Sequence, residues 1–72
     1  MSKTVDARGL SCPQPVLMTL DEIKSGNQSA LLIIVDNEAS RENVSRAVAN
    51  QGWVVAGIEE EDGDYKIRAQ KT

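Results

Sequence analysis

Ala30-Leu31-Leu32-Ile33-Ile34-Val35 is the longest apolar run in this 72-residue sequence, and it decides the fold. The run has the length of a strand, and it lacks the polar alternation of a strand with one face in water. Continuous apolar runs of this kind are typical of strands in the interior of a sheet. We therefore predict a central strand over residues 30–35 that is buried on both faces.

A helix is expected before the central strand, preceded by a short strand over residues 3–7 and a loop over residues 8–13. Pro13 and Pro15 suit a first helical turn, where a missing backbone N–H costs little. Gly26 is expected to end this helix. Between these points apolar residues recur at helical spacing. They are Val16, Leu17, Leu20 and Ile23.

A second helix is expected after the central strand. Ser40 is a favourable residue for its N-cap. Val44, Ala47 and Val48 follow at the spacing of an inner helix face. Gly52 is expected to end this helix.

The last part of the sequence predicts two strands joined by a tight turn. Residues 53–61 form the first strand, which starts at Trp53, a residue expected in the core or at its rim. Asp62-Gly63 is a strong signal for a two-residue hairpin turn. Residues 65–70 then alternate between apolar and polar side chains, as in a half-exposed strand.

The resulting element order, βαβαββ, predicts an α+β fold. Two helices on one face of a four-stranded mixed sheet form a two-layer α/β sandwich, which is the natural packing for this order. The length predicts a single domain over residues 1–72. A domain of this size buries only about 60% of its unfolded surface, so its core is thin and chemistry must rest on a few exposed groups.

Charge and composition exclude several classes of protein. The formal net charge is −3 and no cluster of Lys and Arg exists, which argues against direct binding of nucleic acid. No apolar run of a secretory signal follows the N-terminus, and residues 30–35 are too few to span a membrane, so we expect a cytoplasmic protein. One Cys and no His exclude a disulfide framework, a Cys/His metal site and a Cys-His dyad within the chain, and we expect no cofactor.

Cys12 is the only strong nucleophile candidate, and its position supports that role. It lies at the predicted start of the first helix, where unpaired backbone N–H groups and the helix dipole favour an anion. The thiol pKa is therefore expected to fall, which populates the nucleophilic thiolate. Arg8 would add positive charge nearby, and Gly9 suits a tight bend between strand and helix.

Other interpretations of these features stay open. A lone cysteine in a cytoplasmic protein is often a buried small hydrophobic residue. Asp36-Asn37-Glu38 follows the central strand and either holds functional carboxylates or is a solvated loop that leads into the second helix. The acidic run over residues 59–62 either docks a basic partner or is simply the exposed end of a hairpin.

Residues 6–16, Asp-Ala-Arg-Gly-Leu-Ser-Cys-Pro-Gln-Pro-Val, resemble the signature of the TusA/SirA/YedF family of small sulfurtransferases. In that family a Cys-Pro-x-Pro motif follows an Asp-x-x-Gly-Leu lead-in. Cys12, Pro13 and Pro15 match the motif, and Asp6, Gly9 and Leu10 match the lead-in, in register. The length and element order match as well, so the resemblance covers nearly the whole chain.

The resemblance implies a persulfide carrier with a fold like that of the C-terminal domain of translation initiation factor 3. The cysteine that matches Cys12 accepts a sulfane sulfur from a cysteine desulfurase or another donor and passes it to an acceptor protein, in the best-known case toward tRNA thiolation. Residues 35–44 are more similar to the YedF branch, which is associated with selenium metabolism. We expect a monomer with transient partners.

Two further classes of function stay open beside the sulfur carrier. One is a regulatory or adaptor module that binds a protein through the same fold without transferring sulfur. The other is a selenium carrier, which needs the same exposed thiolate on Cys12. Whether the chain acts as an enzyme in the strict sense depends on which of these roles it has.

Overall fold

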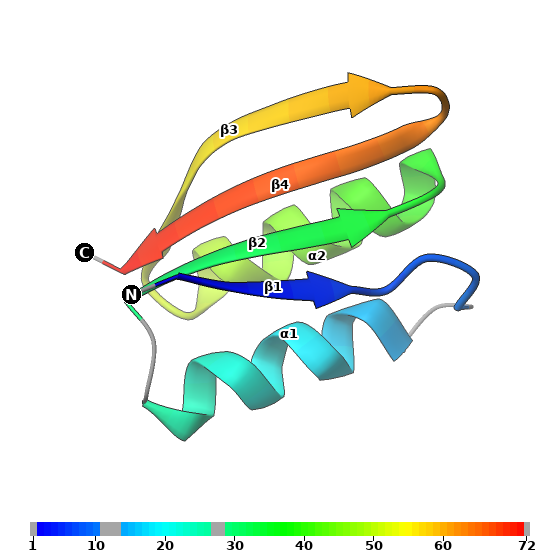
Figure 1. Ribbon diagram of the computed structural model, residues 1–72. Helices are drawn as coiled ribbons and strands as arrows, with labels where there is room; N and C mark the ends of the chain where they lie inside the picture. Colours follow the sequence, from blue (N-terminus) through cyan, green and yellow to red (C-terminus); the bar gives the residue numbers. More distant parts are fainter. Residues whose placement is uncertain (1, 11–13, 27–28, 72) are drawn as a thin grey trace.

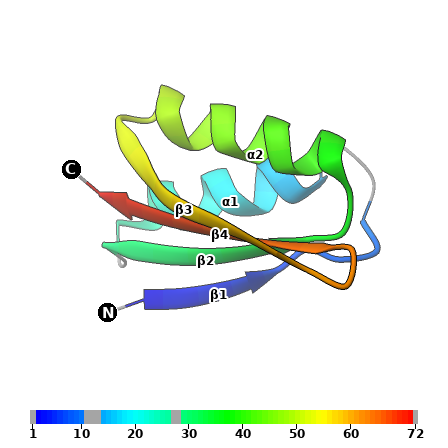
Figure 2. The same ribbon diagram turned by 90° about the horizontal axis from the view of Figure 1, so that it is seen from above.

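The structure is a computed structural model that describes residues 2–10, 14–26 and 29–71. Its elements follow the expected order of strands and helices (Figure 1). They are β1 (Ser2–Asp6), α1 (Gln14–Ser25), β2 (Ala30–Val35), α2 (Glu38–Asn50), β3 (Trp53–Glu61) and β4 (Asp64–Lys71). Seen from above, both helices lie on the same side of the sheet, which confirms the two-layer α+β fold (Figure 2).

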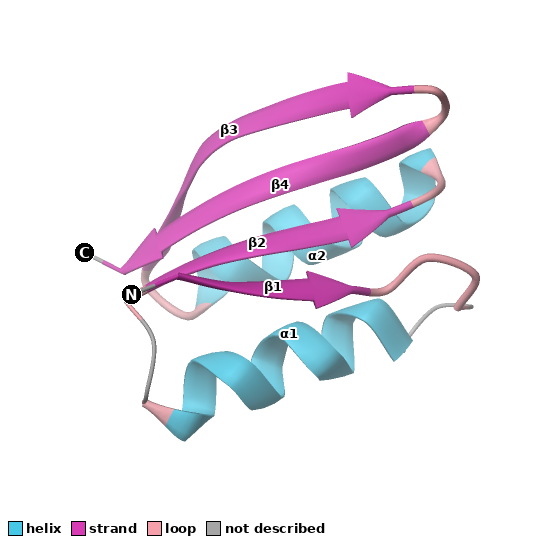
Figure 3. Ribbon diagram, in the orientation of Figure 1, coloured by secondary structure: helices cyan, strands magenta, loops and turns pink. Residues whose placement is uncertain are grey.

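The four strands form one mixed sheet in the order β1-β2-β4-β3 (Figure 3). β1 and β2 are parallel, whereas β4 is antiparallel to both of its neighbours, β2 and β3. The parallel pair requires a crossover connection, and α1 supplies it. β2 is therefore an interior strand, as its continuous apolar sequence predicts.

Only one face of β2 is fully buried. Leu31, Ile33 and Val35 are 0–2% exposed and belong to the core beneath the helices. The alternate residues Leu32 and Ile34 are half-buried on the other face. The prediction of burial on both faces is thus wrong, because both helices cover the same face of the sheet and no described element covers the other face.

α1 packs through fewer apolar residues than its sequence suggests. Pro15 and Thr19 are its buried residues, and the Thr19 hydroxyl donates to the Pro15 carbonyl at 2.9 Å. Val16 and Ile23 pack against the core while partly buried, but Leu17 is 47% exposed. Gly26 follows the helix with a positive φ of 73°, which confirms the predicted stop.

The N-cap of α2 is Asn37 and not Ser40, so this prediction is wrong. The Asn37 side-chain oxygen accepts a hydrogen bond from the Ser40 backbone N–H at 2.8 Å, while Ser40 itself is 2% exposed within the helix. Asn is as favourable an N-cap as Ser, and starting at Asn37 gives the helix another turn. Val44 and Val48 are fully buried, as predicted, and Ala47 is half-buried.

β3 and β4 form the predicted hairpin. Asp62 and Gly63 both have positive φ, 53° and 85°, which fits the type I′ turn that an Asp-Gly pair favours. Trp53 is 7% exposed and belongs to the core. In the part of the chain that the structure describes, neither helix is long and apolar enough to cross a membrane.

Candidate functional site

The candidate site is the connection from β1 to α1, of which residues 7–10 and the helix start at Gln14 are described. Cys12 and Pro13, on which the sequence-based prediction centres, lie outside the described residues. The connection lies at the end of the sheet where β1 and β2 end and both helices begin (Figure 1). Buried Ala7 anchors its start, because its N–H donates to the Ile34 carbonyl at 2.8 Å.

A carboxylate from the β2–α2 connection holds this loop. Asp36 Oδ2 accepts a hydrogen bond from the Gly9 backbone N–H at 2.7 Å. Asp36 Oδ1 accepts from Asn37 Nδ2 at 3.1 Å, and Asn37 in turn caps α2. Gly9 has a positive φ of 78°, which glycine adopts at little cost. Within residues 36–38, Asp36 thus has a structural role, because its hydrogen bonds connect the loop before Cys12 to the start of α2.

We expect Asp36→Ala to lower the free energy of unfolding by about 1 kcal/mol, because the Gly9 N–H loses a charged acceptor in a partly solvated place. Chemical denaturation measures this loss. Asp21→Ala removes an exposed carboxylate from α1 and is the matched control, expected to change stability by less than about 0.5 kcal/mol. Equal stability of the two variants would contradict the anchoring role of Asp36.

Arg8 links the loop to the hairpin. Its guanidinium donates to both carboxylate oxygens of Asp6, at 2.8 and 2.9 Å, and to Asp64 Oδ2 at 3.3 Å. The Arg8 backbone N–H also donates to Asp6 Oδ1 at 3.2 Å. Asp64 is the first residue of β4, so the bridge joins segments that are 56 positions apart. The positive charge predicted near Cys12 is therefore largely balanced by two carboxylates.

The hydrogen bonds from Arg8 lower the pKa of Asp6 from 3.8 to about 2, and the same bonds to Asp6 and Asp64 raise the pKa of Arg8. A carboxylate whose pKa is lower in the folded state contributes stability above its unfolded pKa. That contribution is lost as the pH falls through the folded pKa. All three side chains are substantially exposed, so the effect on stability is small.

We expect Asp6→Asn to flatten the dependence of stability on pH between about 4 and about 2, where wild-type Asp6 becomes protonated. Denaturation midpoints measured across this range test the prediction. Asp62→Asn is the matched control, because it removes a carboxylate from the hairpin turn without touching Arg8. The same pH profile in wild type and Asp6→Asn would contradict the assigned bridge.

The remaining residues of the predicted motif differ in how far they are buried. Pro15 is buried at the start of α1, so it fixes the helix to the core on the far side of residues 11–13. Leu10 is 37% exposed and Leu17 is 47% exposed. These two apolar side chains lie two residues before and five residues after Cys12 in sequence. Among the described residues, no group of three or more His, Cys, Asp or Glu side chains is placed to hold a metal ion.

Comparisons with known proteins identify the family and support the fold. Residues 3–71 match the family described as Sulfurtransferase TusA. A protein of Methanocaldococcus jannaschii named "Putative sulfur carrier protein MJ0990" is 33% identical over 72 residues, which covers 96% of this chain and 93% of that protein. The crystal structure of a SirA-like protein from Desulfitobacterium hafniense superposes with a TM-score of 0.84 at 24% identity, covering 94% of this chain and 95% of the other. That likeness supports the fold.

Proposed function

Because this chain belongs to the TusA family of sulfurtransferases, we propose that it is a sulfur carrier that holds a sulfane sulfur as a persulfide on Cys12. The observation that carries the proposal is the position of its only cysteine within the family motif. The loop before Cys12 is held by Asp36 and Arg8, and buried Pro15 fixes the chain after it. The described residues before and after Cys12 in the sequence are thus held in place.

The proposed chemistry is a transfer of one sulfur atom between thiols. The Cys12 thiolate attacks the outer sulfur of a persulfide on a donor protein, and the S–S bond of the donor breaks. The donor leaves as a thiolate, and Cys12 now carries the persulfide. In the second step an acceptor thiolate attacks the outer sulfur, and Cys12 leaves as a thiolate. No net oxidation or reduction occurs, so the transfer itself requires no redox cofactor.

The start of α1 supports this chemistry. The first backbone N–H groups of a helix have no partner within the helix and favour an anion before it. α1 begins at Gln14 and has no acidic residue in its first turn, so nothing there opposes a thiolate or persulfide anion. The chain has a single cysteine, so a persulfide on Cys12 cannot be discharged by a second thiol of the same chain. Release to a partner is therefore the remaining route.

The partners we propose are a sulfur donor, such as a cysteine desulfurase, and an acceptor protein. The acceptor pathway we propose first is tRNA thiolation, with the carrier contacting a protein and not the RNA, because the chain has a net charge of −3. Leu10 and Leu17 are exposed and apolar, and they lie close to Cys12 in sequence, so they suit contacts with these proteins.

The proposal is tested in two stages by intact-mass spectrometry. Incubation with a cysteine desulfurase and free cysteine is expected to add the mass of one sulfur atom, and dithiothreitol should remove it. The loaded protein, freed of donor, should then lose this sulfur to an added acceptor protein. If no sulfur is gained while the protein still binds the desulfurase, an adaptor role replaces the carrier role. Repeating the loading with a selenium donor measures whether selenium is preferred.

A further inference from the structure

β1 is an edge strand whose outer side can receive another strand. Among the residues that the structure describes, it pairs only with β2, and the Ala7 N–H donates to the Ile34 carbonyl of that strand. Backbone groups of successive strand residues point to opposite sides, so residues 3, 5 and 7 share the side that faces β2. The backbone N–H and C=O groups of Thr4 and Asp6 therefore point outward, away from the sheet.

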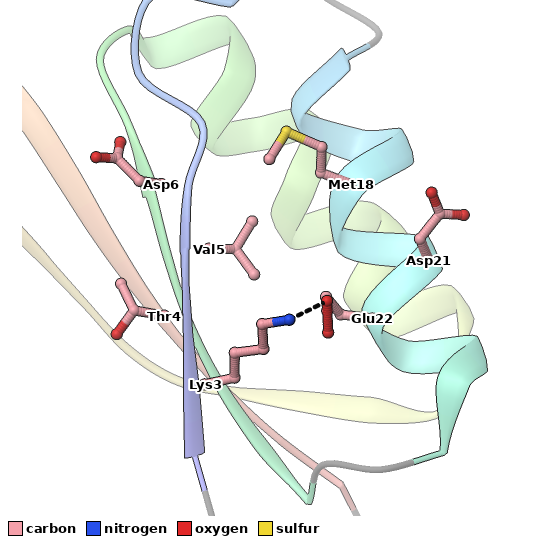
Figure 4. A pocket seen from close by; sticks show the side chains of 7 residues that line it. All are labelled: Lys3, Thr4, Val5, Asp6, Met18, Asp21 and Glu22. Carbon is pink, nitrogen blue, oxygen red and sulfur yellow. Dashed lines mark hydrogen bonds and ion pairs between the residues drawn. The ribbon is translucent and has the colours of Figure 1, made fainter.

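A groove runs beside this edge, between β1 and α1 (Figure 4). Its volume is about 260 Å³, and residues 3–6 of β1 line it together with Met18, Asp21 and Glu22 of α1. Val5 and Met18 supply its apolar part, and Met18 is only half-buried. The Lys3 Nζ–Glu22 Oε1 ion pair, at 2.7 Å, spans the groove between the two elements.

The charges of the groove favour a basic occupant. The carboxylates of Asp21 and Glu22 line its α1 side together with Lys3, whereas the Asp6 side chain points away from α1 (Figure 4). Asp6 is paired with Arg8, and Glu22 is paired with Lys3. Asp21 is exposed and makes no ion pair within residues 2–10, 14–26 and 29–71. An incoming lysine or arginine would find a carboxylate here that no cation already occupies.

The opposite edge of the sheet is less suited to the same role. β3 carries a bulge between Val55 and Gly57, and bulged edges resist pairing with another strand. The register of β1 against β2 is uninterrupted from Ser2 to Asp6. An unbulged edge beside an apolar and acidic groove is thus found on the β1 side.

We propose that the β1 edge binds an extended segment of a partner protein as a fifth strand of the sheet, and that an apolar residue and a lysine or arginine lie two positions apart in this segment, so that both face α1. Backbone hydrogen bonds to Thr4 and Asp6 hold the segment, as in other cases of strand addition. Of its side chains on the helix side, an apolar one contacts Met18 and a basic one lies near Asp21. β1 leads directly into the loop before Cys12, so, resting on the proposed function, we assign this segment to a sulfur donor or acceptor.

Two synthetic peptides test the proposal on the wild-type protein. The first is an acetylated and amidated seven-residue peptide that carries valine and lysine in turn on one face of the strand and threonine on the other face. The second has the same sequence with methyl groups on alternate backbone nitrogens, chosen along the edge that would pair. We expect the first peptide to shift the amide NMR signals of Thr4 and Asp6. We expect the methylated peptide to bind at least about fivefold more weakly, because it loses backbone hydrogen bonds. Equal binding of both peptides, or shifts confined to β3, would overturn the proposal.

Variants of the protein test the two contacts of the proposed surface, which are the carboxylate of Asp21 and the outward backbone N–H of Thr4. Asp21→Asn is expected to weaken peptide binding about two- to fivefold, because an exposed ion pair is lost. Asp62→Asn removes a carboxylate from the distant hairpin turn and should leave binding unchanged. Thr4→Pro removes an outward N–H and should abolish binding while the core stays folded, as its NMR spectrum would show. Equal weakening by Asp21→Asn and Asp62→Asn would contradict a specific groove.

The peptide-binding test and the sulfur-transfer test distinguish a failure of the proposed β1 surface from a failure of the proposed function. Cys12→Ser should bind the peptide as tightly as wild type, since the surface needs no thiol. A saturating concentration of peptide should slow sulfur loading from a cysteine desulfurase or discharge to an acceptor. Normal loading without peptide binding would overturn the β1 surface alone. Peptide binding without any sulfur loading would overturn the proposed function and leave the surface standing.

Discussion

Cys12→Ser is expected to abolish sulfur loading and to leave the domain folded. The variant lacks the only thiol in the chain, so no persulfide can form on it. The sequence predicts that Cys12 lies in a surface loop, and exchanging sulfur for oxygen in such a loop is expected to change stability by less than about 0.5 kcal/mol. In a domain of this size the melting temperature should then change by less than about 4 °C. Intact-mass spectrometry after loading and a thermal melt measure the two quantities.

A swap variant provides the matched control for position. Ser11→Cys combined with Cys12→Ser keeps the composition and moves the thiol by one residue. If the place of the thiol before α1 matters, the swap variant loads sulfur more slowly than wild type. Equal loading rates would mean that any thiol in the loop suffices. A large drop in the melting temperature of Cys12→Ser would instead identify a buried structural cysteine.

Ile33→Ala is expected to cost about 2–5 kcal/mol of stability, the largest effect of a single change on the fold. Ile33 is 0% exposed in the interior strand β2, opposite Ile67 of β4, which is also fully buried. A domain of 72 residues has a total stability of about 4–11 kcal/mol. The truncation therefore removes a large share of it. Urea denaturation measures the loss as a lower midpoint.

Ile34→Ala is the control for this prediction, because it removes the same atoms from the next residue of the same strand. Ile34 is half-buried on the face of the sheet that no helix covers. We expect it to cost about 1 kcal/mol, since less apolar surface is lost and no enclosed cavity forms. Similar costs at both positions would contradict the assignment of one covered and one open face to β2.

Most of the fold could be predicted from the sequence, because most local sequence patterns indicate the same helices, strands and turns that the structure contains. The continuous apolar run gives β2, and Asp62-Gly63 gives the hairpin, since the turn requires two residues with positive φ. The failures come from tertiary packing. Two helices on one face leave Leu32 and Ile34 half-buried, which the composition of the run alone does not reveal. Leu17 has helical spacing but is 47% exposed, since the spacing alone does not show how far each side chain is covered.

The N-cap of α2 was predicted wrongly for a different reason. Asn37 and Ser40 are both favourable cap residues three positions apart, and propensity does not separate them. The structure selects Asn37 because its side chain reaches the Ser40 N–H and its neighbour Asp36 bonds to Gly9. The hydrogen bond from Gly9 to Asp36, the neighbour of the cap residue, joins residues 27 positions apart in sequence.

Only part of the candidate site could be predicted from the sequence. The motif around Cys12 and the bend at Gly9 follow from local residue types. The hydrogen bonds that hold the loop cannot be predicted in this way, because their acceptors, Asp36 and Asp64, come from other parts of the chain. A signal for Asp36 exists in hindsight: an acidic residue directly after a buried parallel strand lies at the edge where functional loops meet. No comparable local signal marks the partnership of Arg8 with Asp64.

Tandem mass spectrometry of a trypsin digest, made under non-reducing conditions after loading, locates the transferred sulfur. Cleavage after Arg8 and Lys24 releases residues 9–24, which contain the only cysteine. We expect one additional sulfur atom on this peptide, with the fragment ions placing it on Cys12. A loaded protein whose additional mass lies on any other peptide would contradict it.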